Sequence, residues 1–204
     1  RIAQLINRRE ANGQKTVLSL ASGRSMRDLF VELVRLHKEE GLSFKNVVVF
    51  GSYEFYPLSD TTSGSMAQIQ SQLLEHVDIL PENVHTFPGD LPKEDVFAFC
   101  EEYEKAIVEA GGIDIQVLGI GQCGNIAMNE PGTQPNSSTR LVIMDGNSRV
   151  DVKSLFGNVA QVPTCAITLG VETILQAKEV ILLAFGQHKA GIVKQAIEEV
   201  ANAA

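Results

Sequence analysis

The stretch TVLSLASGRSMRDLFVELVRLHKEEGLSFKNVVVF (16–50) combines two short β-branched runs with one longer amphipathic segment. The runs TVLSL (16–20) and NVVVF (46–50) have the length and composition of buried strands. Between them, apolar residues of the segment 26–39 recur at the three- and four-residue spacing of a buried helix face. A strand, a helix and a second strand in this order predict a βαβ unit with two parallel strands in one sheet.

The same alternation of strand-like and helix-like segments continues along the chain. Further strands are predicted at 84–87, 113–120, 140–144, 165–170 and 179–185, with helices near 65–77, over 95–112 and from 188. No repeat or linker-like composition interrupts the pattern, so residues 1–204 are expected to form one domain. The sequence starts with Arg1 and ends in ANAA (201–204), as an excerpt of a longer protein would. It predicts a three-layer, doubly wound, Rossmann-like α/β fold with a mostly parallel sheet, whose ligands bind beyond the carboxyl ends of the strands.

Composition and charge exclude several classes of function. The 204 residues are 44% hydrophobic and 21% charged, which allows a sizeable core. The formal net charge is −8 and the Lys and Arg residues are scattered, so we expect neither a nucleic-acid surface nor an acidic-membrane surface. No apolar run approaches the roughly 20 residues that cross a bilayer. Small molecules or other proteins are the expected partners.

Cysteine and histidine spacing argues against disulfides and metal binding. Cys100, Cys123 and Cys165 are widely spaced and form no CxxC pair, so neither a disulfide framework nor a zinc site is expected. The four histidines fall in separate predicted elements without the spacing of metal ligands. Reduced cysteines in a cytoplasmic protein without a metal are the expectation.

The segment LASGRSM (20–26) joins the first strand to its helix. Residues 22–25 (SGRS) place hydroxyl groups, a flexible backbone and a guanidinium at a helix N-terminus, where free N–H groups and the helix dipole favour an anion such as phosphate. The alternative is that Ser22 or Ser25 caps the helix. The segment has neither the P-loop pattern GxxxxGK[ST] nor the dinucleotide-binding pattern GxGxxG. From the residues alone, both interpretations stay open.

Two further segments contain candidate acid–base residues. In FGSYEFYPLSD (50–60), interpreted as a loop, Glu54 and Asp60 carry carboxylates, although acidic residues of loops are commonly only solvated. In GIGQCGNIAMNEPG (119–132), the glycines allow sharp backbone bends, and Glu130 is the only carboxylate. The ending NEPG also fits a simple turn boundary, because proline restricts the residue before it.

Taken together, the three segments resemble the glucosamine-6-phosphate deaminase (isomerase) family, which is related in fold to 6-phosphogluconolactonases. The family pattern L-x-T-G-x-[TS]-P corresponds to 20–26, and F-N-M-D-E-Y corresponds to 50–55. The pattern G-[VI]-G-x-D-G-H-I-A-F-N-E-P-G corresponds to 119–132, which keeps the glycines and the whole NEPG ending. That ending favours deaminase-like proteins over lactonases. The resemblance covers nearly the whole chain and implies the fold of the deaminases.

The resemblance implies aldose–ketose isomerisation of an amino-sugar phosphate with release of ammonia, without a cofactor or a metal. Tyr53 and Cys123 stand where the family has aspartates, and Asn125 stands where it has the ring-opening histidine. Glu130 matches the glutamate of the family, and Glu54 is a further candidate for residual acid–base work. Tyrosine is mostly protonated at neutral pH and asparagine does not titrate, so three catalytic positions are impaired.

The resemblance also implies which residues hold the phosphate of the sugar. They are Ser22, Gly23, Ser25 and Lys189, with Arg24 as an additional cation. A family arginine that helps hold the phosphate falls at Ser154, beside Lys153. We therefore expect phosphate binding to be better preserved than proton transfer.

Two functions are consistent with these residues. The first is a glucosamine-6-phosphate deaminase-like enzyme of amino-sugar phosphate metabolism, with weak or altered activity. The second is a catalytically inactive sugar-phosphate binding or regulatory module. A changed chemistry at Cys123 is a third interpretation, against the alternative that this cysteine fills a small buried space. Because the family often forms oligomers, a homo-oligomer is a further expectation.

Overall fold

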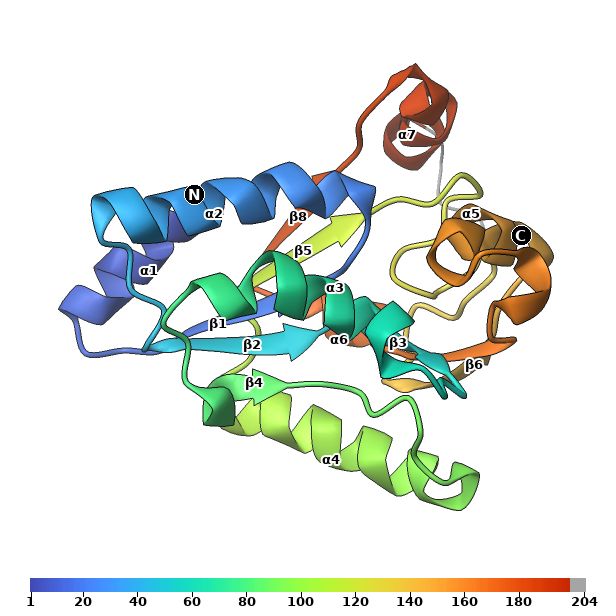
Figure 1. Cartoon of the computed structure of the whole chain (residues 1–204), viewed down its shortest axis with the longest axis horizontal. Helices are drawn as coiled ribbons and strands as arrows, with labels where there is room; N and C mark the ends of the chain where they lie inside the picture. Colours follow the sequence, from blue (N-terminus) through green and yellow to red (C-terminus); the bar gives the residue numbers. More distant parts are fainter. Residues whose placement is uncertain (199–204) are drawn as a thin grey trace.

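The strand–helix–strand unit at 16–50 forms the centre of a parallel sheet, as predicted. The computed structural model describes residues 1–198, and Figure 1 traces their path through the fold. The sheet has the order β4-β2-β1-β5-β8, with β1 at Thr16–Leu20, β2 at Val47–Gly51, β4 at Val84–His85, β5 at Ile115–Gly119 and β8 at Glu179–Leu183. All neighbouring strands are parallel, and Leu18 of β1 pairs with Val49 of β2 and Ile115 of β5.

Helices cover both faces of this sheet and give the three layers. One face packs against α1 (Ile2–Ala11), α2 (Arg27–Glu40) and α3 (Ser65–Gln72). The other packs against α4 (Val96–Glu109) and α6 (Val171–Leu175) (Figure 1). Every residue of β1 and β2 is buried, as expected for parallel strands covered on both sides. The α/β class and the mostly parallel main sheet are thus confirmed.

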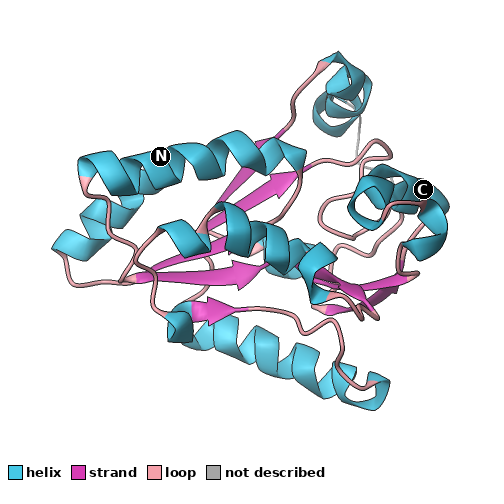
Figure 2. Ribbon diagram, in the orientation of Figure 1, coloured by secondary structure: helices cyan, strands magenta, loops and turns pink. Residues whose placement is uncertain are grey.

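A second, smaller sheet lies beyond the carboxyl ends of the main strands (Figure 2). It contains β3 (Tyr53–Tyr56), β7 (Cys165–Thr168) and β6 (Arg140–Ile143) in the order β3-β7-β6, and both pairings are antiparallel. The interpretation of the whole segment 50–60 as a loop is therefore wrong. The aromatic residues of β3 favour a strand, and its pairing partner β7 lies more than a hundred residues later in the chain, which local pattern does not reveal.

Two further helices lie beside the loop that follows β5. The helix α5 (Gly146–Phe156) connects β6 to β7, and α7 (Ala190–Glu198) follows β8 (Figure 1). The helix predicted from 188 is confirmed as far as Glu198, and the remainder of that prediction lies outside the described residues. The helix α5 was not predicted, because its sequence GNSRVDVKSLF has little apolar periodicity. Its start is instead fixed by Asp145, whose Oδ1 accepts the N–H of Asn147 at 2.8 Å.

The described helices differ from membrane-spanning helices in length or apolar character. Within residues 1–198, no helix combines the length and the apolar character that a bilayer span requires.

Candidate functional site

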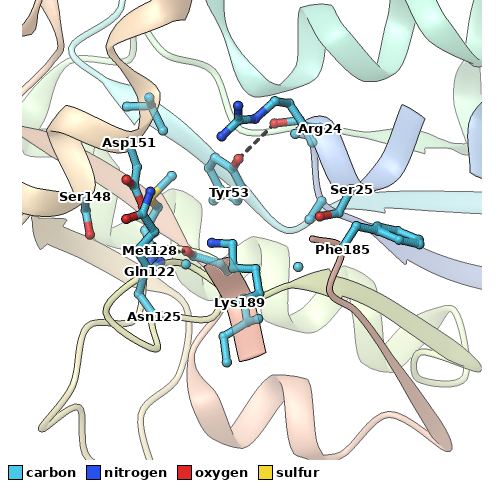
Figure 3. A pocket seen from close by; sticks show the side chains of 18 of the residues that line it. Arg24, Ser25, Tyr53, Gln122, Asn125, Met128, Ser148, Asp151, Phe185 and Lys189 are labelled. Atoms are coloured by element: carbon cyan, nitrogen blue, oxygen red, sulfur yellow. Dashed lines mark hydrogen bonds between the residues drawn. The ribbon is translucent and has the colours of Figure 1, made fainter. Parts of the chain in front are cut away.

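A cavity of about 370 Å³ lies at the carboxyl ends of β1, β5 and β8, where ligands of doubly wound folds bind (Figure 3). The loops that follow these strands form much of its wall, with residues 21–25 from the first and 119–122 from the second. The third loop contributes Phe185, His188 and Lys189. The helix α5 closes another side. The location predicted from the strand order is therefore the location of the cavity.

The loop after β1 has the geometry of an anion-binding segment. Gly23 has φ +119°, a value that residues with a side chain rarely adopt, and it leads into the short 3₁₀ turn Arg24–Met26 at the start of α2. No side chain caps this turn or α2, so the capping alternative for Ser22 and Ser25 is wrong. The N–H groups of the first turn are left without a side-chain cap, as in helix ends that bind anions.

Lys189 brings a cation to the same cavity from the other end of the chain. Gly186 has φ +90°, and a Cβ atom there would come within 2.8 Å of the His188 ring. This sharp bend is followed by the turn Gln187–Lys189, from which the Lys189 ammonium points into the cavity (Figure 3). Neither Lys189 nor Arg24 forms an ion pair within the described part of the chain. Two unpaired cations therefore face one cavity.

The glycine-rich loop after β5 closes on itself. The Gly121 N–H donates to the Asn125 carbonyl oxygen at 2.9 Å, and a Cβ atom on Gly121 would lie 1.7 Å from Asn125 Oδ1. A side chain at position 121 would therefore displace the Asn125 side chain, which lines the cavity. The NEPG ending is anchored by Asn129, whose Nδ2 donates to the Leu169 carbonyl oxygen at 2.8 Å.

Tyr53 reaches the cavity from β3. Its side chain is 8% exposed, and its hydroxyl lies 2.9 Å from Ser22 Oγ, a hydrogen bond that Figure 3 draws. Burial raises the pKa of Tyr53 above its ordinary value. At neutral pH this residue is therefore a protonated hydrogen-bonding group rather than a base.

Glu54, the next residue of β3, does not line the cavity. Its carboxylate accepts the backbone N–H groups of Phe55 at 2.9 Å, Ser65 at 2.7 Å and Met66 at 2.9 Å, and so holds the N-terminus of α3. Burial raises the pKa of Glu54, and the three backbone hydrogen bonds oppose the shift. Successive strand residues face opposite sides, which explains why Tyr53 faces the cavity and Glu54 does not.

Glu130 and Cys123 also lie outside the cavity wall. Glu130 Oε1 accepts the N–H of Asp145 at 3.1 Å, next to the start of α5, while its buried Oε2 has no hydrogen-bond partner within residues 1–198. Cys123 is half-buried and free. The cavity is lined by Ser22, Gly23, Arg24, Ser25, Lys189, Tyr53 and Asn125, but not by Glu54, Cys123 or Glu130. The catalytic roles of these residues stay predictions.

The structure adds polar residues that the sequence did not single out. Ser148 and Asp151 reach the cavity from α5, and Asp28 reaches it from α2. The sequence signal for Ser148 and Asp151 is Asp145, a residue type that commonly caps helices. A helix that starts at Asp145 has positions 148 and 151 on one face. Among residues 1–198, no group of three or more His, Cys, Asp or Glu side chains is arranged to hold a metal ion.

Solved structures with the same fold include enzymes of two activities. The chain matches the structure of a monomeric glucosamine-6-phosphate deaminase with 32% identity and a TM-score of 0.92, over 99% of this chain and 82% of the other. It matches 6-phosphogluconolactonase from Trypanosoma brucei with 21% identity and a TM-score of 0.74, over 98% and 81%. The second likeness shows the fold alone.

Sequence relatives carry the deaminase name. A glucosamine-6-phosphate deaminase-like protein of Bacteroides thetaiotaomicron is 46% identical over 198 residues, which are 97% of this chain but 30% of that protein. Glucosamine-6-phosphate deaminase of Bacillus pumilus is 39% identical over 197 residues, 94% of this chain and 79% of that protein. The family described as glucosamine-6-phosphate isomerases/6-phosphogluconolactonase matches residues 1–204. The chain belongs to this family, and within the family it is glucosamine-6-phosphate deaminase-like, as are the relatives described above.

Proposed function

We propose that this protein binds a phosphorylated hexosamine in the cavity at the carboxyl ends of β1, β5 and β8, with little or no turnover. One observation carries the proposal. The residues expected to bind phosphate, although they come from opposite ends of the chain, all line this cavity: Ser22, Gly23, Arg24, Ser25 and Lys189. The cavity of about 370 Å³ falls within the roughly 300–1,000 Å³ of small-molecule sites.

The part of the cavity wall formed by Ser22–Ser25 and Lys189, which we call the phosphate end, combines several sources of positive potential. The uncapped first turn before α2 offers backbone N–H groups, and Gly23 allows the close approach of a phosphate oxygen. Arg24 and Lys189 add two formal charges that no carboxylate neutralises within 4 Å in the described structure. Charge-assisted hydrogen bonds to phosphate are about twice as strong as neutral ones, so this end dominates ligand affinity.

Proton transfer has weaker support. Tyr53 is protonated at neutral pH, Asn125 does not titrate, and Glu130 and Cys123 lie outside the cavity wall. Each well-placed acid or base contributes about 10²- to 10⁴-fold to a rate, so the loss of such groups leaves little of the deaminase reaction. Binding is therefore the activity that the geometry supports best.

Residual deamination is the second candidate, and Glu130 favours it. Its buried Oε2 accepts no hydrogen bond within residues 1–198, and the loop that carries Glu130 also contributes to the cavity wall. Residual deamination requires this carboxylate to reach the bound sugar.

Calorimetric titration and a product assay on one preparation separate the two candidates. We expect glucosamine 6-phosphate to bind, and Lys189→Ala to weaken its binding by about tenfold or more. Lys45→Ala is the matched control, because Lys45 is exposed and lies outside the cavity wall. Ammonia and fructose 6-phosphate that disappear in Glu130→Gln would establish the enzyme. If the unmodified protein neither binds nor converts glucosamine 6-phosphate, the proposal is wrong.

A further inference from the structure

The cavity has two chemically different ends. In Figure 3, Arg24 and Ser25 lie on one side, Ser148, Asp151 and Asn125 lie on the other, and the Lys189 ammonium points between them. The first side carries donors and positive charge. The second carries acceptors, and its one carboxylate is that of Asp151.

Asp151 is an unpaired carboxylate on α5. It is half-buried, and its Oδ2 accepts the backbone N–H of Gln122 at 3.3 Å, which ties α5 to the glycine-rich loop. No lysine, arginine or histidine lies within 4 Å of it in residues 1–198. A carboxylate has about four acceptor positions, and one hydrogen bond of 3.3 Å leaves most of them open to a ligand.

Two neutral acceptors accompany Asp151 in the same wall. Ser148 is 3% exposed and lies one helical turn before Asp151 on α5, and its Oγ has no hydrogen-bond partner in the described residues. Asn125 Oδ1 is likewise buried and unpartnered. Buried polar atoms are nearly always hydrogen-bonded, so unpaired atoms of this kind in a cavity wall indicate a ligand that brings donors.

The other carboxylate of the cavity wall differs in position and exposure. Asp28 is exposed and belongs to α2, one helical turn after Arg24, at the phosphate end. The negative charge on the α5 side therefore comes from Asp151.

We propose that Asp151 is a specificity-determining residue that binds the protonated amino group of an amino-sugar phosphate. The inference rests on the proposed function, because it takes the phosphate to lie at Ser22–Ser25 and Lys189. A ligand held there by its phosphate directs its sugar ring towards α5, where a cationic amine meets the Asp151 carboxylate. A hydroxyl group at the same carbon lacks the charge, and an N-acetyl group lacks the charge and is bulkier.

Binding measurements test this without any need for turnover. Glucosamine 6-phosphate, glucose 6-phosphate and N-acetylglucosamine 6-phosphate are titrated by calorimetry at neutral pH into the unmodified protein and into Asp151→Asn. We expect the unmodified protein to prefer the free amine by about tenfold or more, as for a hydrogen bond between charged groups. Asp151→Asn keeps an oxygen acceptor for the Gln122 N–H, removes the charge, and should bind the amine and glucose 6-phosphate equally.

Three further variants make the test specific. Asp151→Glu keeps the charge and should retain the preference for the amine. Asp28→Asn removes one negative charge at the phosphate end and should shift all three affinities in the same direction. Asp151→Ser is a second neutral variant, to be used if thermal unfolding shows that Asp151→Asn does not fold.

Each outcome has a defined meaning. An amine preference that survives in both neutral variants, or is absent from the unmodified protein, overturns the role of Asp151. Binding of glucosamine 6-phosphate in that case still supports the proposed function. Failure of all three sugar phosphates to bind the unmodified protein overturns both proposals.

Discussion

The hydroxyl groups of Ser22 and Tyr53 lie 2.9 Å apart and join the loop after β1 to the strand β3 of the second sheet. Both side chains are buried, and both line the cavity. The Tyr53 hydroxyl therefore supports Ser22, the serine for which we propose a role in phosphate binding. The hydrogen bond fixes the position of the Ser22 side chain in the cavity wall.

Replacing Tyr53 by phenylalanine tests that support. Tyr53→Phe leaves Ser22 Oγ without its partner, so we expect a loss of about 1 kcal/mol in the free energy of unfolding and a roughly threefold to tenfold weaker binding of glucosamine 6-phosphate. Tyr56→Phe is the matched control, because its hydroxyl donates to the Leu91 carbonyl oxygen at 2.8 Å away from the cavity. Urea unfolding should show a similar loss for the control, while calorimetry should show unchanged affinity. Equal affinities for both variants would contradict the role of Tyr53.

Backbone conformation at Gly23 gives a second prediction. A Cβ atom at Gly23 meets no other atom within 4 Å, so Gly23→Ala is strained only by its φ of +119°. We expect a cost of about 1–2 kcal/mol in the free energy of unfolding, or a loop that shifts and binds phosphate less tightly. Gly146→Ala is the control: it also has open space, but its φ is not positive. An unfolding curve for Gly23→Ala that matches that of Gly146→Ala would argue against this loop geometry.

Glu54 provides a prediction on stability and pH. A glutamine at this position brings an NH2 donor in place of one of the two carboxyl oxygens that face the N–H groups of Phe55, Ser65 and Met66. We expect Glu54→Gln to lower the free energy of unfolding at neutral pH by about 1–3 kcal/mol, measured in urea. Binding of glucosamine 6-phosphate is the internal control. It should change little if the fold is retained, because Glu54 does not line the cavity, and it would weaken if the variant displaced the neighbouring Tyr53, which does.

The pH dependence follows from the raised pKa of Glu54. Because the folded state holds this proton more tightly than the unfolded state, the linked contribution to stability is fully present below the ordinary pKa of 4.5 and is lost as the pH rises through the raised folded value. Subtracting the unfolding free energy of Glu54→Gln from that of the unmodified protein isolates this contribution. A difference that grows instead of falling above pH 4.5 would show that the backbone hydrogen bonds outweigh burial.

A buried carboxylate at Asp114 links the N-terminal helix to the sheet. Its oxygens accept the Val17 N–H at 2.9 Å and the Lys178 ammonium at 2.8 Å, and they pair with Arg9 of α1. We expect Asp114→Asn to lower the free energy of unfolding by about 2–4 kcal/mol, because it removes the buried negative charge that pairs with Arg9 and Lys178. Guanidinium unfolding measures the shift. Glu179→Gln, which removes an exposed ion pair with Arg1, should change the midpoint little, and an equal effect of both variants would contradict the prediction.

Local pattern was sufficient for the strands of the main sheet and for the helices α2, α3 and α4. The strand at 16–20 is recognisable as a short buried run, and the helix from 26 by the three- to four-residue spacing of its buried face. Both signals are independent of the rest of the chain. The segment of α5 has no such period, since part of its apolar content is exposed and its start depends on the single cap Asp145. Local pattern therefore missed the helix that carries Asp151.

The sequence by itself determined the α/β class, the succession of the main-sheet strands along the chain and the resemblance to the glucosamine-6-phosphate deaminases, because each of these can be recognised in short, contiguous segments. Only the tertiary structure decided which carboxylates line the cavity. Glu54 turns away from the cavity because strand residues alternate between faces, and Asp151 enters it because α5 packs beside the carboxyl ends of distant strands. Such placement depends on contacts between residues far apart in the chain, and no local spacing encodes it.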